Sequence, residues 1–352
     1  MIHVYISGRH KRRLPLSYSA LAPLFHDHIV LVERPEDADL YLFAHVLDLE
    51  EAAQEVIADW RRRRRPVVLL SEEPFWDTIW GRRPLQGHLE VETRFGTVPV
   101  IQLNHQTSDI FRFDAIPYYL LTNHRFATRY LHRFRRNEAR SAQQWRAAFE
   151  ARSRHLTFMF ERRPEAYHNV RWEKANLIGL CAWRTELAEC FDDDDSDGNL
   201  GTGAERLGQS WQGGKPRFDL PDWHLDKIMR LDDHCRILSA IENTHQPNYI
   251  SEKFFDAFAC GAMPLYYATP EHRIHDFDLP AESWLNLRDL SPNDAAERVR
   301  ALTFDAAFFE AFREAQHLLA NLFSDTDLLV AERERLGQSV QRALRQALED
   351  AS

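Results

Sequence analysis

Residues 246–272 read QPNYISEKFFDAFACGAMPLYYATPEH and place a helix directly before a strand. Ser251 is a preferred N-cap residue, and the three phenylalanines that follow it recur on one face at helical spacing. Gly261 fits the C′ position that ends this helix, because a residue without a Cβ atom tolerates a positive φ. The apolar run AMPLYYA then predicts a strand.

A second apolar run, CRILSAIEN at residues 235–243, predicts a strand before this helix. Strand–helix–strand units connect parallel neighbours in a sheet, and ligands of such sheets bind beyond the carboxyl ends of the strands. The polar residues 242–253 fall at that edge, so we expect them to line a binding site.

The first half of the chain repeats this alternation. The runs IHVYIS, HIVLVE, DLYLFAHV and PVVLLSEE predict strands, the run LEEAAQEVIADWRRRRR predicts a helix between the last two, and VETRFG and VPVIQL predict shorter strands. A second series opens with the strand HLTFMFE, and residues 171–191 predict one amphipathic helix. Continuous apolar strands separated by helices indicate parallel sheets covered on both faces. We therefore predict an α/β protein with domains at residues 1–150 and 151–325 and a helical tail at residues 326–352.

The amino-acid composition limits the classes of molecule that this protein can bind. The 352 residues carry a net charge of −10, which disfavours contacts with nucleic-acid phosphates. No apolar run approaches the ~20 residues that span a bilayer, and the N-terminus resembles a strand and a basic loop, so a cytoplasmic protein is the simplest interpretation. The tail carries Leu336, Val340 and Leu344 on one stripe near arginines. This stripe either makes a peripheral contact with the inner membrane or packs on the protein.

Lys253 is unusual in this chain. Only five of the 44 basic residues are lysines, and this one lies in the first turn of the predicted helix. A cation at this position is repelled by the helix dipole unless an anion compensates its charge. The free backbone N–H groups of a helix start favour an anion such as a diphosphate. Lys253 would then reach a phosphate, and Glu252 would accept hydrogen bonds from ribose hydroxyls. The alternative is that both are ordinary surface residues.

The order of these residues resembles the donor-binding segment of glycosyltransferase family 10, the α1,3/4-fucosyltransferases. The family pattern reads roughly F-E-N-S…Y-[VI]-[TS]-E-K…A…G-A-x-P-[VL]. The matching residues here are Ile241, Glu242, Asn243, Thr244, Tyr249, Ser251, Glu252, Lys253, Ala262 and Pro264. This sequence lacks the leading aromatic residue of that pattern.

The resemblance extends to two upstream segments. VVLLSEEPFWD is similar to the strand that carries the family's proposed catalytic carboxylate, which makes Glu72 the catalytic residue and Glu73 the second candidate. The alternative is that Glu72 caps the turn at Pro74. LTFMFERRPEAYHNVRWEKANL is similar to the segment in which an arginine shortly before a helix meets the donor phosphates. Arg171 takes this role, with Arg163 as the alternative.

The family is inverting and has the GT-B fold, in which two Rossmann-like domains face a cleft. The resemblance implies that residues 1–150 form the acceptor-side domain and that residues 151–325 form the domain that binds the nucleotide-sugar donor. The resemblance implies that GDP-fucose is the donor and that a hydroxyl of a bacterial surface oligosaccharide is the acceptor, so the chain would act in polysaccharide biosynthesis. It implies no required cofactor and no metal site, although a divalent metal is compatible. A different nucleotide sugar, or a non-catalytic relative that binds nucleotides or glycans, are the alternatives. The implied donor-binding residues are Arg171, Arg163, Glu242, Asn243, Tyr249, Ser251, Glu252 and Lys253.

The run DDDDSDG could suggest a metal site. Asp193, Asp195 and Asp197 fit the start of a calcium-binding loop, but its twelfth position is Ala204 rather than Glu. A manganese-binding DxD pair would follow a strand, whereas this run follows a predicted helix. The sequence therefore favours a solvated loop.

Overall fold

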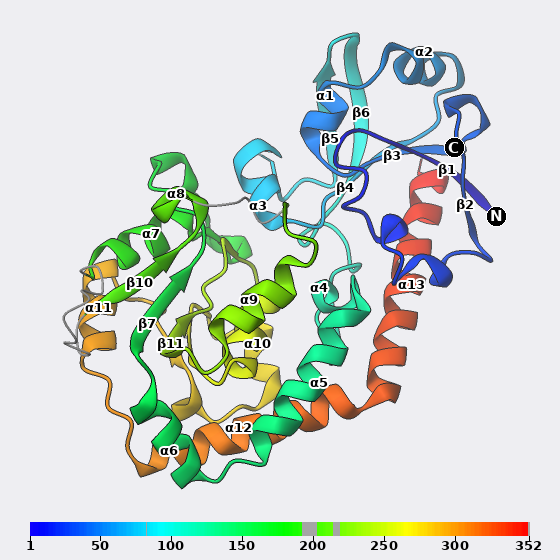
Figure 1. Ribbon diagram of the computed structural model, residues 1–352. Coiled ribbons are helices and arrows are strands. Elements are labelled where there is room, and N and C mark those ends of the chain that lie inside the picture. Colours follow the sequence, from blue (N-terminus) through cyan, green and yellow to red (C-terminus); the bar gives the residue numbers. More distant parts are fainter. Residues whose placement is uncertain (82, 192–202, 214–218, 351–352) are drawn as a thin grey trace. The chain divides into compact units, whose positions relative to one another are not determined.

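The computed structural model describes residues 1–81, 83–191, 203–213 and 219–350. It separates into two compact units (Figure 1). Unit 1 comprises residues 1–124 and 327–352, and unit 2 comprises residues 125–326. The helices of residues 124–151 thus lie almost entirely in unit 2, although the predicted boundary was at residue 150. The predicted roles of the two domains, on the acceptor side for residues 1–150 and in donor binding for residues 151–325, stay predictions.

Unit 1 is built on one sheet with short helices around it. Its elements are β1 (Ile2–Ser7), η1 (Pro15–Ser17), η2 (Ala22–Leu24), β2 (Ile29–Leu31), η3 (Pro35–Asp37), β3 (Leu40–Phe43), α1 (Val46–Glu50), α2 (Gln54–Arg63), β4 (Val67–Leu70), α3 (Pro74–Trp76), the π-helical turn η4 (Asp77–Gly81), β5 (His88–Thr93), β6 (Gly96–Leu103), α4 (Tyr118–Leu121) and α13 (Thr326–Glu349).

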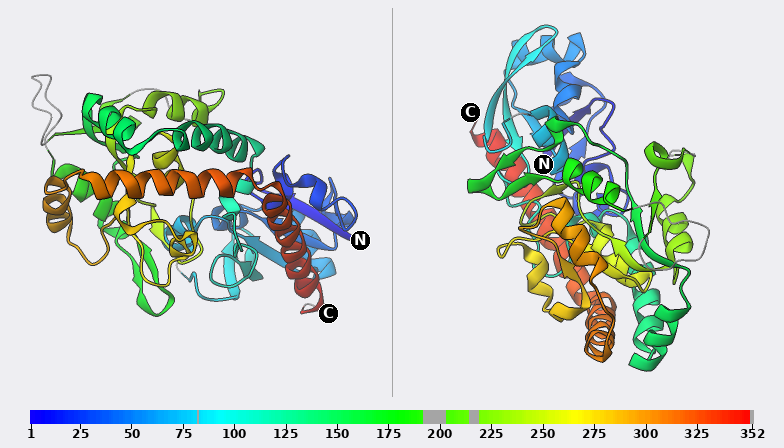
Figure 2. Two further views of the ribbon diagram at one scale, coloured as in Figure 1. Left: turned by 90° about the horizontal axis from the view of Figure 1, so that it is seen from below. Right: turned by 90° about the vertical axis from the view of Figure 1, so that its left-hand side faces the viewer.

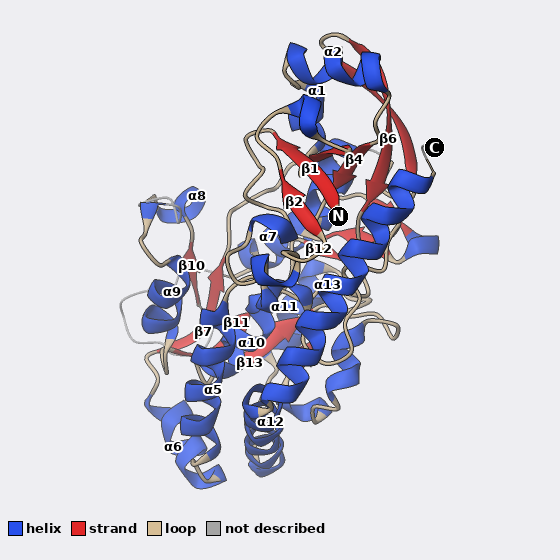
Figure 3. Ribbon diagram, turned by 90° about the vertical axis from the view of Figure 1, so that its right-hand side faces the viewer, coloured by secondary structure: helices blue, strands red, loops and turns tan. Residues whose placement is uncertain are grey.

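The 6-stranded sheet of unit 1 has the order β2-β1-β3-β4-β6-β5. β5 runs antiparallel to β6, and the other neighbours are parallel. Strands β3 and β4 are buried throughout, as expected for strands covered on both faces. Apolar residues of these strands and of α1 and α2 form one core cluster that includes Tyr41, Phe43 and Trp60. Figure 3 shows α1 and α2 beside β4 and β6.

Unit 2 is a second α/β layer structure. Its elements are α5 (His124–Glu138), α6 (Ala142–Ala151), β7 (Arg154–Met159), η5 (Ala166–His168), β8 (Arg171–Trp172), η6 (Glu173–Ala175), β9 (Leu177–Gly179), α7 (Cys181–Glu189), β10 (Ala204–Leu207), α8 (Gln209–Gln212), α9 (Trp223–Leu231), β11 (Cys235–Ser239), β12 (Thr244–His245), α10 (Glu252–Ala259), β13 (Met263–Tyr266), η8 (Arg273–Phe277), η9 (Ala281–Ser283), β14 (Leu285–Asn286), α11 (Pro292–Arg300) and α12 (Ala306–Ser324).

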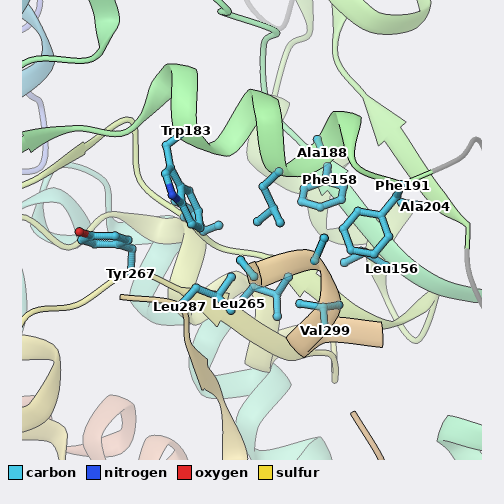
Figure 4. Packing of buried hydrophobic residues seen from close by; sticks show 14 of the residues in the cluster. Leu156, Phe158, Trp183, Ala188, Phe191, Ala204, Leu265, Tyr267, Leu287 and Val299 are labelled. Carbon is cyan, nitrogen blue, oxygen red and sulfur yellow. The ribbon is translucent and has the colours of Figure 1, made fainter. Parts of the chain in front are cut away.

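Its 5-stranded sheet has the order β10-β7-β11-β13-β14, and all its strands run parallel. The predicted parallel pairing of β11 with β13 is confirmed, with Ile237 opposite Met263. The core between sheet and helices contains Leu156, Phe158 and Trp183 (Figure 4). α12 runs as one unbroken helix (Figure 2), and it packs against α6. The predicted α/β class with parallel sheets and a C-terminal helix is confirmed.

The prediction of one helix over residues 171–191 is wrong. Residues 171–172 and 177–179 form β8 and β9, which pair antiparallel with each other in a small sheet with β12, and the helix α7 begins only at Cys181. Asn176 explains the break, because its φ of 51° is a left-handed conformation that turns β8 back onto β9.

The apolar stripe of the C-terminal helix α13 packs on the protein. Leu336, Val340 and Leu344 are fully buried, so this stripe is covered rather than presented to a membrane. Among the described residues, no helix combines the length and the apolar character that a bilayer crossing requires.

Candidate functional site

The helix α10 has the ends that the sequence predicted. The side chain of Ser251 accepts a hydrogen bond from the backbone N–H of Lys253 and caps the helix. Gly261 has a φ of 76°, its N–H donates to Phe258 O, and the N–H of the next residue donates to Ala257 O. These two bonds form a Schellman motif, which ends the helix just before β13.

Lys253 and Glu242 form an ion pair at the N-terminus of α10. The Nζ atom of Lys253 lies 2.7 Å from Oε2 of Glu242 and 2.8 Å from Oγ of Ser251. Oε1 of Glu242 accepts the backbone N–H of Ser251 at 2.8 Å. The anion that compensates this first-turn lysine is therefore a buried carboxylate of the same segment. Lys253 keeps 21% of its side chain exposed, so its amine can also reach a ligand.

A second lysine approaches the same helix end. Nζ of Lys227, on α9, lies 3.7 Å from Oε1 of Glu252 and 2.7 Å from Oδ2 of Asp256. Asp256 is fully buried and also pairs with His224 Nε2 at 2.8 Å. Burial alone would raise the pKa of Asp256, but Lys227 and His224 hold it below its ordinary value. The predicted Glu252 is thus anchored by a lysine that the sequence analysis did not select.

The two arginine candidates lie in different places. Arg171 lies exposed on β8, and its side chain makes no ion pair or hydrogen bond with the described residues. The backbone N–H of Arg163 donates to Oγ1 of Thr185 on α7, so this residue lies against α7. Burial lowers the pKa of His168, and the nearby charges of Arg163 and Arg184 lower it further. The structure thus groups Arg163 with Arg184 rather than with Arg171.

Arg184 is a cation that sequence reasoning missed. It is 4% exposed, and its Nη1 donates to the carbonyl of Ile241 at 3.1 Å, directly before Glu242. Within the described part of the chain its Nε has no hydrogen-bond partner. A buried guanidinium with an unused donor is suited to an anion. The misplaced helix start hid this residue, because the predicted pattern looked for an arginine before the helix rather than on it.

The remaining predicted donor residues lie on the loop between β11 and α10. Tyr249 is 5% exposed, and its backbone N–H donates to Gln246 O. The carbonyl of Asn243 accepts the N–H of Leu180, while its side-chain Oδ1 is buried without a partner among the described residues. An unused buried acceptor costs free energy unless a ligand or water satisfies it.

Glu72 lies beyond the carboxyl end of β4 in unit 1 and is held by three side chains. Arg13 Nε donates to its Oε1, Tyr18 donates to the same oxygen at 2.8 Å, and Tyr118 donates to Oε2 at 2.7 Å. It is 3% exposed, and burial raises its pKa above the ordinary value. These bonds contradict the alternative that Glu72 caps the turn at Pro74.

Glu73 shares the same arginine but is more accessible. Its Oε1 lies 2.5 Å from Arg13 Nη2, and 13% of its side chain is exposed, compared with 2% for Glu72. Arg13 also stacks over the ring of Trp76 at 5.1 Å. Sequence reasoning missed Arg13, Tyr18 and Tyr118 because they are distant in the chain from the glutamates and belong to no shared pattern.

Metal ligands are not gathered in the described parts of either unit. No group of three or more His, Cys, Asp or Glu side chains there could hold an ion. The aspartate run with Asp193, Asp195 and Asp197 lies outside the described residues.

Comparison with known proteins points to one family. Residues 213–326 match the profile of "Glycosyltransferase family 10 (fucosyltransferase) C-term". Over 111 residues the chain is 32% identical to human GDP-fucose protein O-fucosyltransferase 3, and 25% identical to Alpha-(1,3)-fucosyltransferase B of Drosophila melanogaster. These matches cover 31% of this chain but only 22% and 24% of the two relatives, so the chain spans less than a quarter of their length.

Two crystal structures of an alpha1,3-fucosyltransferase, one of them with GDP-fucose, align with 90% of this chain and 81% of theirs. Their sequence identity to this chain is 13% and the TM-score is 0.42, an overlap too loose to transfer residue roles. The resemblance read from residues 241–264 is confirmed by the family profile, which covers that segment.

Proposed function

We propose that this chain, a diverged member of glycosyltransferase family 10, transfers fucose from GDP-fucose to a hydroxyl group. The observation that carries the proposal is the arrangement of Lys253, Ser251 and Glu242 at the N-terminus of α10, beyond the carboxyl ends of β11 and β13. This is where parallel sheets bind their ligands, and a capped helix start with a lysine suits a diphosphate. The relatives named above are described as acting with GDP-fucose or as fucosyltransferases, which supports this donor.

In the proposed donor site, Lys253 and the partial positive charge at the N-terminus of α10 neutralise the diphosphate. Glu242 holds the lysine in place before the donor arrives. Arg184, whose Nε is unused, and Arg163 beside it supply further positive charge. Glu252, anchored by Lys227, accepts hydrogen bonds from the ribose hydroxyls. Fixed charges that stabilise the departing diphosphate lower the barrier without the need for a metal.

The reaction we propose is inverting. The acceptor oxygen attacks the anomeric carbon, the bond from that carbon to the β-phosphate oxygen breaks, and GDP leaves with the bonding electrons. The hydroxyl proton passes to a carboxylate, for which Glu72 and Glu73 are the candidates. Of the two candidates, Glu73 suits this role better, because the substrate must be able to reach the base, and the Glu73 side chain is 13% exposed compared with 2% for Glu72. Glu72 then acts by holding Arg13.

The acceptor we propose is an oligosaccharide, and a cytoplasmic role in bacterial polysaccharide synthesis remains a prediction. Two alternatives follow from the sequence: a different nucleotide sugar, or a relative that binds the donor without turnover. The donor test described next separates both from the main proposal.

The proposal is tested by thermal unfolding of the full chain with GDP, GDP-fucose, UDP and CMP. We expect GDP and GDP-fucose alone to raise Tm, since a ligand at 100 times its Kd adds about 2.7 kcal/mol. Lys253→Ala should abolish this shift, while Lys174→Ala, which removes an exposed lysine of the same unit, should keep it. A shift with UDP or CMP instead would exclude GDP-fucose, and GDP binding without fucose transfer to any glycan would favour the non-catalytic relative.

Lys253→Ala also leaves Glu242 buried without its cation, so the variant could lose stability for a reason unrelated to the donor. The double variant Lys253→Met/Glu242→Gln removes both charges and avoids this problem. If the double variant still responds to GDP as the wild type does, the assignment of Lys253 is wrong.

A further inference from the structure

Four aromatic side chains cluster at the carboxyl edge of the sheet in unit 1. The His10 and His45 rings stack with their centroids 4.6 Å apart, and Trp76 lies 5.4 Å from His10 and 4.7 Å from His45. Trp80 lies 5.2 Å from His45 and is 37% exposed. These rings come from three segments, which follow β1, β3 and β4 in the chain. Ligands of parallel sheets bind at this edge.

The two stacked histidines are fixed in opposite tautomers. Nδ1 of His10 lies 2.8 Å from Oδ1 of the buried Asp48, so the hydrogen is on Nδ1, and in the neutral ring Nε2 is an acceptor. Nδ1 of His45 accepts the backbone N–H of Leu47 at 3.0 Å, so Nε2 of His45 carries the hydrogen and is a donor. Burial, with His10 and Arg9 nearby, lowers the pKa of His45 to about 4, which keeps this ring neutral at pH 7. Within the described residues, neither Nε2 has a hydrogen-bond partner.

The backbone is shaped to bring these groups together. Gly8 has a φ of 102°, and a Cβ atom at this position would lie 2.4 Å from Cβ of Asp48. Only glycine therefore lets the chain pass over Asp48 and present both the backbone N–H and the ring of His10 to that carboxylate. Trp80 lies on the π-helical turn η4, a rare conformation that occurs frequently at functional sites.

The cluster is continuous with the glutamates of unit 1. Arg13 stacks on Trp76 at 5.1 Å and bonds to both Glu72 and Glu73. Arg13 thus connects Glu73 to Trp76, and Trp76 in turn contacts both histidines, so a substrate whose hydroxyl reaches Glu73 can place a neighbouring ring on this cluster. The ring faces are electron-rich, and the unused nitrogens offer one acceptor and one donor.

We infer that His10, His45, Trp76 and Trp80 form a binding site for a pyranose ring of the acceptor. A pyranose has C–H groups on one face, which suit the aromatic rings, and adjacent hydroxyls, which suit the donor and acceptor nitrogens. The assignment of this sugar ring to the acceptor rests on the proposed function. The binding of a pyranose at these four side chains does not depend on that function.

The inference is tested by saturation-transfer NMR and titration of the full chain with the methyl pyranosides of glucose, galactose, mannose and N-acetylglucosamine. We expect at least one of them to bind and to receive saturation at its ring C–H protons. Trp80→Ala should weaken its binding about tenfold, and His10→Phe, which keeps a ring but loses Nε2, should weaken it by a similar factor. Leu31→Ala, at an exposed position on β2, should bind as the wild type does.

The thermal shift with GDP is measured on every variant, both to show that it is folded and to report on the donor site. If none of the four pyranosides binds, or if Trp80→Ala and His10→Phe both bind as the wild type, the inference is overturned even where GDP still binds. If a pyranoside binds with the expected variant effects but GDP does not, the sugar site stands and the proposed function fails. Trp80→Phe, which keeps an aromatic face, should retain most of the affinity.

Discussion

Each unit holds one buried glutamate just beyond the end of a parallel strand, and the two are held differently. Glu72 and Glu242 are both 3% exposed. Glu72 is bound by the planar guanidinium of Arg13 and by two tyrosine hydroxyls. Glu242 is bound by the amine of Lys253 and by one backbone N–H.

The difference indicates which of the two paired cations can also bind a ligand. A guanidinium and two phenols form a cage of preorganised donors, so Glu72 is a fixed support. A lysine is a compact charge on a flexible stem, and 21% of the Lys253 side chain is exposed. Because an ammonium group has three N–H donors, Lys253 can contact an incoming anion while it stays paired with Glu242. The cation of unit 1 is fixed on its glutamates, whereas the cation of unit 2 can take a ligand as a further partner.

The largest expected effect separates the two glutamates of unit 1. Glu73→Gln should reduce the turnover of fucose transfer by 10²- to 10⁴-fold with unchanged GDP affinity, because an amide cannot accept the acceptor proton. Glu72→Gln should reduce turnover less, because it keeps the shape of the cage while weakening the bond from Arg13. Single-turnover kinetics with GDP-fucose, together with GDP binding, measure both. A larger loss of turnover in Glu72→Gln than in Glu73→Gln would identify Glu72 as the catalytic base instead.

A smaller effect is expected from the carboxylate of unit 2. Glu242→Gln should weaken GDP binding about tenfold, or about 1.4 kcal/mol, because Lys253 loses the charged partner that positions it. Calorimetric titration with GDP gives this value, and Glu173→Gln, at an exposed position of unit 2, is the control. Unchanged or tighter binding in Glu242→Gln would show that the carboxylate competes with the donor for Lys253 rather than positioning it.

The same comparison explains what could be predicted from the sequence. Glu242, Ser251 and Lys253 lie within one short segment, so helix capping and the family pattern identified them together, and the structure brings them into contact. The strands and α10 were also predictable, because apolar runs and helix caps are local signals.

The cage around Glu72 could not be predicted in this way. Arg13, Tyr18 and Tyr118 are brought together only by the folding of the whole sheet, and no local spacing relates them. The misassigned region has a similar cause. Residues 171–191 have a helical composition, but the left-handed turn at Asn176 and the pairing of β9 with β12 override that tendency. This error concealed Arg184, since its role depends on where α7 begins.

The smallest expected effect concerns pH, and it distinguishes a caged carboxylate of unit 1 from a paired one of unit 2. Burial raises the pKa of Glu72, so its contribution to stability is present below the unfolded pKa of about 4.3 and is lost as pH rises through the folded value. Lys227 and His224 outweigh burial and lower the pKa of Asp256, so its contribution is present above about pH 4 and is lost as pH falls. The free energy of unfolding should therefore change with pH in opposite directions for the two residues.

Urea unfolding between pH 3 and pH 8 measures how the free energy of unfolding changes with pH in the wild type and in the variants. The stability of the wild type relative to Glu72→Gln should fall as pH rises above about 4.3, by about 1.4 kcal/mol for each unit by which the pKa is raised. Its stability relative to Asp256→Asn should instead fall below about pH 4. Asp226→Asn, at an exposed position of α9, should show neither trend. If both buried variants show the trend of Asp256, then Arg13 and the two tyrosines outweigh burial at Glu72, and that carboxylate is an ion pair like the one in unit 2.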